Sequence, residues 1–525
     1  MAIRLLLPAF FFCVALALDS TQTPQAYDTP VVLATVRKIE ESCIFANDFQ
    51  FLRRIAWQES LDGRMLPSIW TTFKGKGGIW QIDPIALQDV QNRSTTAMNQ
   101  KKAQISAQYG IDINALNRDN SDLEIPINAG IVARLKLFTI AAPIPMNINA
   151  QAAYWKTYYN TAAGSGTVEQ FLANMQKIPP CNARGADLLF ILDSSGSIGS
   201  STFTNVRTFV QTVIQGLNID PDANQVGIID FSDSAVTVIS FNSSKSALMA
   251  AAGSMKYYGS GTATTLALNQ AVINFNAARD PSSGFPRVAV LVTDGQPNDP
   301  PSASAAAEAL KASGITLFTV GVTSGADNTD LPNMASNPSC LYYYSLASYA
   351  ELASEFPDIL NSRTCDTSAA APSNSSAISA SVAQGQSLPF RFPVNITQGI
   401  TFKLAMSSGQ ATIYASTKTR LPSSAEYEFM ATASVGQLGQ IYIPPNDMHL
   451  NDSSYAFNRL LSDYAAADST SGTVTVFASV TGTAANTNNF TLQFNDGDTR
   501  EKGAASALCF MPALLFLYAL IMFVL

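Results

Sequence analysis

The sequence feature that most constrains this chain is an apolar run, 188–192, followed directly by Asp193-Ser194-Ser195-Gly196-Ser197. An unbroken apolar run of this kind is typical of a strand buried on both faces of a sheet. The chain therefore places one carboxylate and several hydroxyls at the end of a strand, and such hard oxygen ligands suit Mg2+. The string alone is weak evidence, because Ser197 or Ser200 would serve equally well as a helix cap.

Two further segments supply oxygen ligands at the boundaries of predicted elements. Gly259-Ser260-Gly261-Thr262-Ala263-Thr264 opens an apolar pattern with helical spacing, and the apolar run 288–292 ends in Thr293-Asp294-Gly295. With these strings, residues 186–365 resemble the von Willebrand factor type A family. The metal-ion-dependent adhesion site (MIDAS) of that family combines D-x-S-x-S, a threonine from a G-x-T-x-T-like loop and the aspartate of a strand-ending T-D-G.

The resemblance implies a role for each of these residues. Ser195, Ser197 and Thr262 would bind Mg2+ or Mn2+ directly, while Asp193 and Asp294 would act largely through water. Mostly neutral direct ligands leave the cation electron-poor, so an open position can attract a carboxylate. The resemblance thus implies adhesion to an extracellular protein partner that offers a carboxylate, and not catalysis.

The remainder of 186–365 alternates predicted strands and helices, which predicts an α/β doubly wound, mostly parallel sheet covered by helices. The predicted elements are strands 226–231, 235–241 and 315–322 and helices 302–313 and 348–360. In open sheets of this kind, ligands bind beyond the carboxyl ends of the strands. Asp193 and Asp294 both follow such ends.

The two ends of the chain predict a route to the cell surface. With 525 residues, 47% of them hydrophobic, the chain has material for three domains. Residues 1–18 are typical of a signal peptide. Residues 496–525 are typical of a hydrophobic anchor signal, with Asn495 as the expected attachment residue and 503–505 as a second candidate. We therefore expect a glycolipid-anchored protein on the extracellular side of the membrane, with an ordinary membrane helix as the alternative.

Cysteines and sequons agree with the secretory route. Four cysteines lie between the two terminal segments, and the favoured pairing is Cys43 with Cys181 and Cys340 with Cys365. Cys181 with Cys365, a bracket around the adhesion module in proteins of the family, is the rival pairing. N-glycosylation is expected at six sequons, which begin at Asn92, Asn242, Asn374, Asn395, Asn451 and Asn489.

Residues 36–184 are predicted to be helical, and they carry three short motifs. Glu59-Ser60 closes a predicted helix, Gly78-Ile79-Trp80-Gln81 follows as a G-x-x-Q turn, and a Y-N-x-G-like segment lies at 158–164. These motifs resemble the lysozyme-like fold of goose-type lysozymes and soluble lytic transglycosylases. The resemblance implies that Glu59 is a general acid and that Gln81 lines a groove for a glycan such as peptidoglycan.

The role of Glu59 would require a pKa raised by burial beside apolar groups such as Trp57, Trp80 or Tyr159. For a second carboxylate, Asp62 and Asp83 remain open. The alternative is that Glu59 and Gln81 are polar residues of a retained scaffold without turnover.

Composition excludes several other functions. The single histidine, His449, excludes Ser-His-Asp and Cys-His hydrolases and His-ligated zinc. The net charge of −8 without basic runs gives no support to nucleic-acid binding.

The last third of the chain is predicted to hold a linker and a sandwich. Residues 366–380 form the expected linker, and 381–495 show six alternating segments typical of an antiparallel β-sandwich. The leading hypothesis is therefore a metal-dependent adhesion protein. The alternatives are a lysozyme-like hydrolase or transglycosylase tethered to an adhesion module, and a structural matrix component that bridges polymers.

Overall fold

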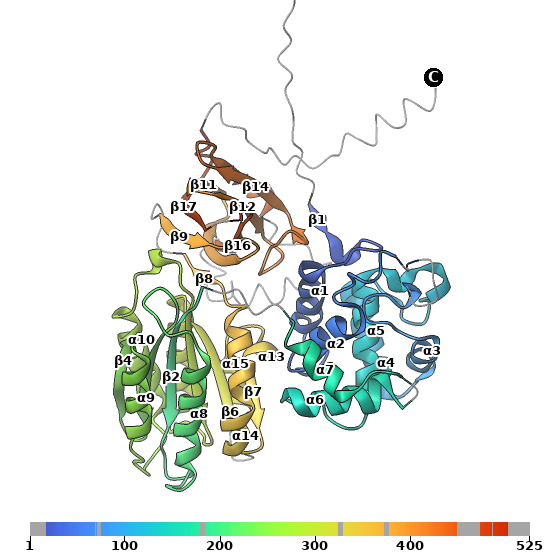
Figure 1. Cartoon of the computed structure of the whole chain (residues 1–525). Helices are drawn as coiled ribbons and strands as arrows, with labels where there is room; N and C mark the ends of the chain where they lie inside the picture. Colours follow the sequence, from blue (N-terminus) through green and yellow to red (C-terminus); the bar gives the residue numbers. More distant parts are fainter. Residues whose placement is uncertain are drawn as a thin grey trace, which may run out of the picture.

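The computed structural model contains a helical domain, an α/β domain and a β-sandwich that meet at one junction (Figure 1). It describes residues 17–68, 70, 75–162, 164–178, 184–323, 329–371, 377–448, 473–485 and 487–501. Most of the predicted signal peptide, the hydrophobic end of the chain, Cys181, Asn374, His449 and Asn451 lie outside these residues. Within the described ranges, no helix is both long and apolar enough to cross a membrane.

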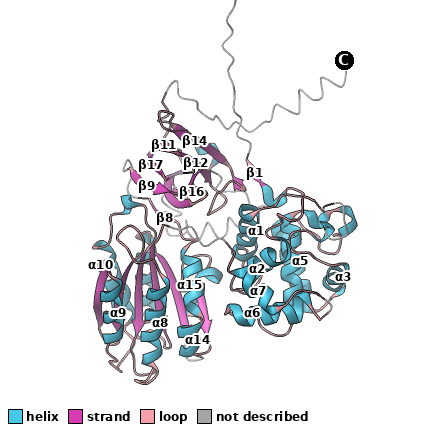
Figure 2. Ribbon diagram, viewed as in Figure 1, coloured by secondary structure: helices cyan, strands magenta, loops and turns pink. Residues whose placement is uncertain are grey.

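The α/β domain is built on the predicted mostly parallel sheet, whose strands are drawn in magenta among the helices in Figure 2. The strand order is β4-β3-β2-β5-β6-β7. All neighbouring strands are parallel except the pair β3 and β4, which is antiparallel. The strands are β2 Asp187–Asp193, β3 Gln225–Phe231, β4 Ala235–Asn242, β5 Arg287–Thr293, β6 Thr316–Val322 and β7 Tyr343–Leu346. Strands β2 and β5 lie side by side in register, so their carboxyl ends bring Asp193 and Asp294 to the same edge.

Helices cover both faces of this sheet, because successive side chains of a strand point to opposite faces. On one face, Phe190 packs in a core with α8 (Phe203–Gly216), α9 (Lys245–Ser254), α14 (Tyr349–Ser354) and α15 (Phe356–Thr364). On the other face, Leu189 packs with α10 (Thr264–Asn276), α11 (Pro300–Ala312) and α12 (Asp330–Met334). The predicted last helix, 348–360, is two helices in the structure, α14 and α15, which meet at Glu355. Helix α15 continues to Thr364 at the end of the domain.

The β-sandwich has two sheets, with strand orders β14-β12-β16-β10-β8 and β15-β11-β17-β9. The strands are β8 Ala369–Ala370, β9 Ile378–Val382, β10 Ser387–Asn395, β11 Ile400–Ser408, β12 Gln410–Ser416, β14 Phe429–Ser434, β15 Gly439–Ile443, β16 Thr473–Gly482 and β17 Asn488–Asp496. All pairs within these sheets are antiparallel except β8 with β10. The expected linker 366–380 is therefore too long, because both of its ends contribute strands to the sandwich.

The helical domain packs its elements around α5 (Pro126–Phe138), which is buried on nearly all sides. Its other helices are α1 Thr29–Glu41, α2 Phe51–Ser60, α3 Pro84–Asn92, α4 Thr96–Tyr109, α6 Ile148–Tyr154 and α7 Val168–Met175, with a π-helical turn at Trp155–Asn160. Helix α1 begins before the expected domain start at residue 36, because Asp28 accepts a hydrogen bond from Thr29 N and Pro30 follows in the first turn. Still earlier, β1 (Leu18–Asp19) pairs with β13 (Glu426–Tyr427) of the sandwich region.

The end of α1 holds the helical domain against the α/β domain. A disulfide joins Cys43 to Cys340, so the favoured pairing of Cys43 with Cys181 and Cys340 with Cys365 is wrong. That pairing assumed that each disulfide closes within one domain, whereas this bond spans 297 residues between two domains. Cys365 is itself disulfide-bonded.

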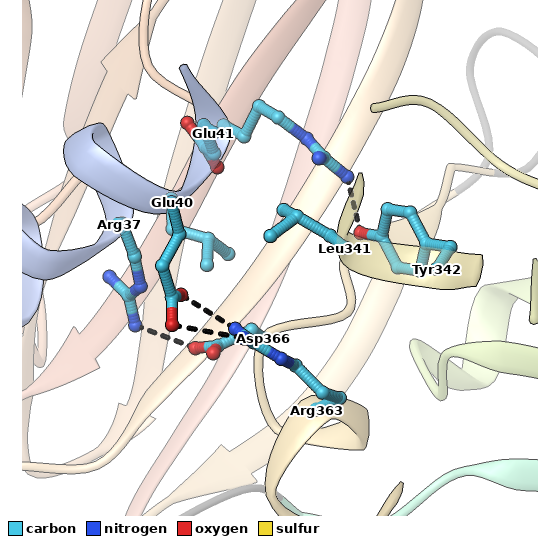
Figure 3. Close-up of a pocket in the computed structure, with 9 residues that line it drawn as sticks. Arg37, Glu40, Glu41, Leu341, Tyr342, Arg363 and Asp366 are labelled. Atoms are coloured by element: carbon cyan, nitrogen blue, oxygen red, sulfur yellow. Dashed lines mark hydrogen bonds and ion pairs between the residues drawn. The ribbon is translucent and has the colours of Figure 1, made fainter. Parts of the chain in front are cut away.

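Ion pairs beside this disulfide line a pocket between α1 and the α/β domain (Figure 3). The Arg363 guanidinium donates to both Glu40 carboxylate oxygens at 2.6 and 2.9 Å, and Arg37 Nη2 lies 2.9 Å from Asp366 Oδ1. Arg420, from the sandwich region, donates to the Tyr342 hydroxyl at 2.6 Å. Side chains from all three domains therefore meet at this place, which we call the junction.

The sandwich contacts the amino ends of the sheet strands. Arg391 in β10 donates to the carbonyl oxygen of Gly314 at 2.6 Å and to the Thr316 hydroxyl at 3.3 Å. Thr316 is the first residue of β6, and β6 is parallel to β2 and β5 through the sheet. The carboxyl ends of the strands, with Asp193 and Asp294, consequently lie at the edge opposite the sandwich.

Candidate metal centre

Asp193 ends β2 and organises the loop that follows. Its Oδ1 accepts a hydrogen bond from Ser195 N at 2.7 Å, which turns the chain so that the Ser195 and Ser197 hydroxyl oxygens lie 3.1 Å apart. Its Oδ2 accepts from the Thr293 hydroxyl at 2.5 Å. Both oxygens of this buried carboxylate are thus engaged by hydrogen bonds, as an indirect role toward a cation requires.

Asp294 closes the cluster from β5. Its Oδ1 accepts from the Ser197 hydroxyl at 2.6 Å. Asp193 and Ser195 are buried, while Ser197 is exposed. The cluster therefore has a buried floor and one side that opens to solvent.

Thr262 reaches the same edge on a loop that is fixed by backbone hydrogen bonds. Gly259 N donates to Ser194 O at 2.8 Å, and Gly196 N donates to Ser260 O at 2.8 Å. These two backbone bonds join the Thr262 loop to the loop that carries Ser195 and Ser197. Asn298 holds Thr262 itself, with Thr262 N donating to Asn298 Oδ1 at 3.1 Å and Asn298 N donating to Thr262 O at 3.0 Å.

Gly295 shows how closely these hydroxyls converge. A Cβ on this residue would lie 3.4 Å from Thr262 Oγ1 and 3.7 Å from Ser197 Oγ. Both hydroxyls therefore border the space beside Gly295, and a side chain there would enter it. The structure brings together all five residues that the sequence predicted for the site.

The charge of the cluster is uncompensated. In the described part of the chain, neither Asp193 nor Asp294 forms an ion pair with lysine or arginine. Burial raises the pKa of Asp193 to about 6 and also raises the pKa of Asp294. Two carboxylates that are buried without a cationic side chain favour binding of a cation.

A third carboxylate, missed by the sequence analysis, lies beside them. Asp230 in β3 pairs with Leu192 of β2, is 1% exposed, and neither of its oxygens has a hydrogen-bond partner among the described groups. Burial raises its pKa to about 7. These observations fit a divalent cation: three hydroxyls and two carboxylates present hard oxygen ligands, and a third carboxylate adds negative charge beneath them.

Two other residues that the sequence analysis missed shape the Thr262 loop. The Ser232 hydroxyl accepts from Ser260 N at 3.0 Å and donates to Gly261 O at 3.0 Å. Asp233 accepts from Gly261 N at 2.8 Å and from the Ser260 hydroxyl. Both residues directly follow β3, so the rule that identified Asp193, polar residues after a buried strand, could have found them.

Glu59 lies in a different environment, near the end of α2. Its Oε1 accepts a hydrogen bond from the Trp155 indole at 2.8 Å, and burial raises the pKa of this half-buried carboxyl. The expected apolar neighbours Trp57 and Trp80 direct their indoles elsewhere, to Asn174 O and Leu52 O. A raised pKa is present as predicted, but the hydrogen bond comes from Trp155, which the sequence analysis missed.

The other residues predicted for a glycan site are engaged in local structure. Gln81 has φ +51° and donates from Nε2 to Gly78 O at 2.8 Å. Asp62 is fully buried, with Arg53 Nη1 at 2.5 Å, and Asp83 caps α3 by accepting from Ala86 N at 2.6 Å. Asp62 is thus bound to Arg53, whereas Asp83 is exposed and uses one oxygen as a helix cap. The lysozyme-like interpretation stays a prediction.

The predicted modification sites occupy different surroundings. Asn92 and Asn489 are exposed, whereas Asn242 and Asn395 are half-buried. Asn495, the expected anchor attachment residue, lies inside β17 opposite Thr401.

Fold and site together define a von Willebrand factor type A domain, and the family model of that domain matches residues 187–358. Human matrilin-3 is 34% identical over 206 residues, which are 38% of this chain and 41% of matrilin-3. The human collagen alpha-1(XXI) chain is 32% identical over 190 residues, or 36% of this chain and 19% of the collagen. The chain thus spans less than half of these relatives.

Among solved structures, proximal thread matrix protein 1 from the mussel byssus is 22% identical. The match covers 38% of this chain and 53% of that protein, with a TM-score of 0.31. Another structure of the same protein has a zinc-occupied MIDAS motif.

Proposed function

We propose that this protein is an extracellular adhesion protein that captures a carboxylate of a protein partner through a divalent cation, Mg2+ or Mn2+. Ser195, Ser197 and Thr262 would hold the cation, with Asp193 and Asp294 acting largely through water. The observation that carries the proposal is the convergence of these five residues at one edge of the sheet, with no lysine or arginine paired to either carboxylate in the described residues.

The relatives support the extracellular part of this proposal. The matched regions of matrilin-3 and the collagen chain belong to proteins of the extracellular matrix. A bound cation there would supply the positive charge that attracts a partner's carboxylate. The exposed Ser197 marks the side from which that partner would approach.

The test is cation binding by the full chain and by Asp193→Ala, measured by isothermal titration with Mg2+ and Mn2+. We expect the variant to lose at least the roughly 10–100-fold in affinity that removal of an outer-shell partner costs. Asp89→Ala, which changes an exposed carboxylate on α3, is the matched control and should bind as the wild type does. Equal cation affinity in wild type and Asp193→Ala would overturn the assignment.

We further propose that the chain is held at the cell surface by a lipid anchor beyond the sandwich. Chain cleavage at Asn495 would remove bonds that the sandwich uses, since the Thr401 hydroxyl donates to Gly497 O at 2.5 Å and Glu501 N donates to Gln440 Oε1 at 2.9 Å. The second candidate, 503–505, follows these bonds. The sandwich therefore favours attachment at 503–505.

A second candidate function, glycan cleavage by the helical domain, rests on Glu59. Burial raises the pKa of its carboxyl, as a general acid needs, whereas the hydrogen bond from the Trp155 indole favours the ionised form. Asp62 is bound to Arg53, and no hydrogen bond joins Asp83 to Glu59 among the described residues, so the adhesion function has the stronger support.

A further inference from the structure

Tyr349 is a buried tyrosine whose hydroxyl forms no hydrogen bond with the described residues. It is the first residue of α14, follows the N-cap Ser348, and is 3% exposed. Among the described residues its hydroxyl has no hydrogen-bond partner. Because a buried polar group without a partner destabilises a protein, and phenylalanine would fill the same space, packing does not account for this hydroxyl.

Tyr349 lies at the edge of the sheet that carries the candidate metal centre. It follows β7, which is parallel to β6, so α14 begins beyond the carboxyl ends of the strands, and α14 packs against α8, the helix that follows the Ser197 loop. The Asp294 and Asp193 carboxylates lie close enough for their charge to add to the effect of burial, which raises the pKa of this hydroxyl. The hydroxyl therefore stays protonated and can only help the site as a neutral hydrogen-bond donor or acceptor.

The carboxylates differ in how much capacity they retain for another donor. Asp193 already accepts through both oxygens, from Ser195 N and from the Thr293 hydroxyl. Asp294 accepts from Ser197 through Oδ1, which leaves Oδ2 for a second donor. Asp294 is also slightly less buried than Asp193, at 6% against 1% exposed.

We infer that Tyr349 is a positioning residue of the metal centre, whose hydroxyl donates to Asp294 or to a water of the cation's shell once the cation is bound. This inference rests on the proposed function. A metal-bound water or a reoriented Asp294 would supply the acceptor that the hydroxyl lacks. Cation binding would thereby remove the energetic cost of burying the Tyr349 hydroxyl without a hydrogen bond. Outer-shell hydrogen bonds of this kind orient the ligands of a metal.

The test compares Tyr349→Phe with wild type in the full chain, by thermal unfolding in chelator and by titration with Mn2+ and Mg2+. In chelator we expect the variant to unfold at the same temperature as wild type or higher, because an unpartnered hydroxyl has been removed. With cation we expect affinity to fall roughly 10-fold, at the lower end of outer-shell effects. The cation-induced rise in unfolding temperature should shrink accordingly.

Tyr344→Phe is the matched control, since Tyr344 is equally buried but its hydroxyl accepts from Asn47 at 3.3 Å. That variant should unfold at a lower temperature in chelator and keep the wild-type cation affinity. Unchanged cation affinity in Tyr349→Phe, with wild type binding normally, would overturn the role of Tyr349 alone. Absence of cation binding by wild type would overturn the proposed function, and with it this inference.

Discussion

Carboxylates at the junction and at the candidate metal centre are all at least partly buried but are compensated in opposite ways. At the junction, Glu40 receives two hydrogen bonds from Arg363, and Asp366 pairs with Arg37. At the metal centre, Asp193 and Asp294 receive hydrogen bonds only from neutral hydroxyl and amide groups among the described residues. Arginine side chains compensate the negative charge at the junction, whereas the candidate metal centre remains negative.

The difference teaches how one chain separates structure from binding. A carboxylate that already has an arginine is closed to other cations, and its value lies in holding the domains together. A carboxylate held by hydroxyls is fixed in place but keeps its charge for a ligand from solution. Variants that remove one group from each region should therefore act on different measurements.

The largest expected effect comes from breaking the junction. Arg363→Met leaves Glu40 buried without its partner, and we expect the free energy of unfolding to fall by about 3–5 kcal/mol. Chemical denaturation with and without Mg2+ measures this change. Cation affinity should stay as in wild type, because the junction and the metal centre share no side chain.

Two further variants provide comparisons for the stability loss expected of Arg363→Met. Arg93→Met breaks an exposed pair with Asp89 and should cost about 0.5 kcal/mol or less. Asp294→Asn should leave the stability in chelator unchanged or higher while it weakens cation binding, because burial opposes the charge of Asp294. A loss of several kcal/mol from Asp294→Asn in chelator would contradict the distinction between the two regions.

A smaller effect is expected from pH at the junction. Burial raises the pKa of Glu41 to about 7, against the opposing influence of Arg420 and Arg37. Because the folded-state pKa lies above that of the unfolded chain, ionised Glu41 destabilises the fold above about pH 7, and this cost disappears as the pH falls toward the ordinary glutamate value. We expect up to about 3 kcal/mol more stability from this group at pH 5 than at pH 8.

The comparison of wild type with Glu41→Gln by denaturation at pH 5, 6, 7 and 8 isolates this group. The variant should lose most of the difference between pH 5 and pH 8 that Glu41 contributes. An identical pH dependence in the two proteins would show that Glu41 does not titrate in this range.

The smallest effect is expected at Glu59, whose compensation is intermediate between the two regions. A neutral indole donates to it and Lys136 is near enough to favour its charge. Glutamine keeps an oxygen for Trp155, so Glu59→Gln should change the free energy of unfolding by no more than about 1 kcal/mol and leave cation affinity unchanged. Clearing of bacterial cell walls by wild type but not by Glu59→Gln would establish the glycan function, and equal behaviour would exclude it.

The sequence predicted which residues lie together at the candidate metal centre because a rule of topology brings them to one edge. Asp193 and Asp294 each follow a buried strand, and neighbouring parallel strands end at one edge. Orphaned groups such as Asp230 could not be predicted, because the absence of a partner depends on every surrounding side chain. The Tyr349 hydroxyl was missed for the same reason.

Contacts between domains also could not be predicted from the sequence. Cys43 and Cys340 are far apart along the chain and belong to different domains, so no local pattern links them. The same holds for Glu40 with Arg363, while Trp155 and Glu59 are far apart along the chain within one domain. Spacing predicts neighbours within one element, whereas these pairs depend on how whole helices pack.

The attachment of the sandwich to the amino ends of the strands has a mechanical consequence. A partner bound at the proposed metal centre would pull on the carboxyl end of β2, while Arg391 holds the start of β6 at the opposite edge. A load between partner and sandwich would therefore run along the strands, so that rows of inter-strand hydrogen bonds share it in shear. The disulfide between Cys43 and Cys340 would pass part of this load to the helical domain through a covalent bond.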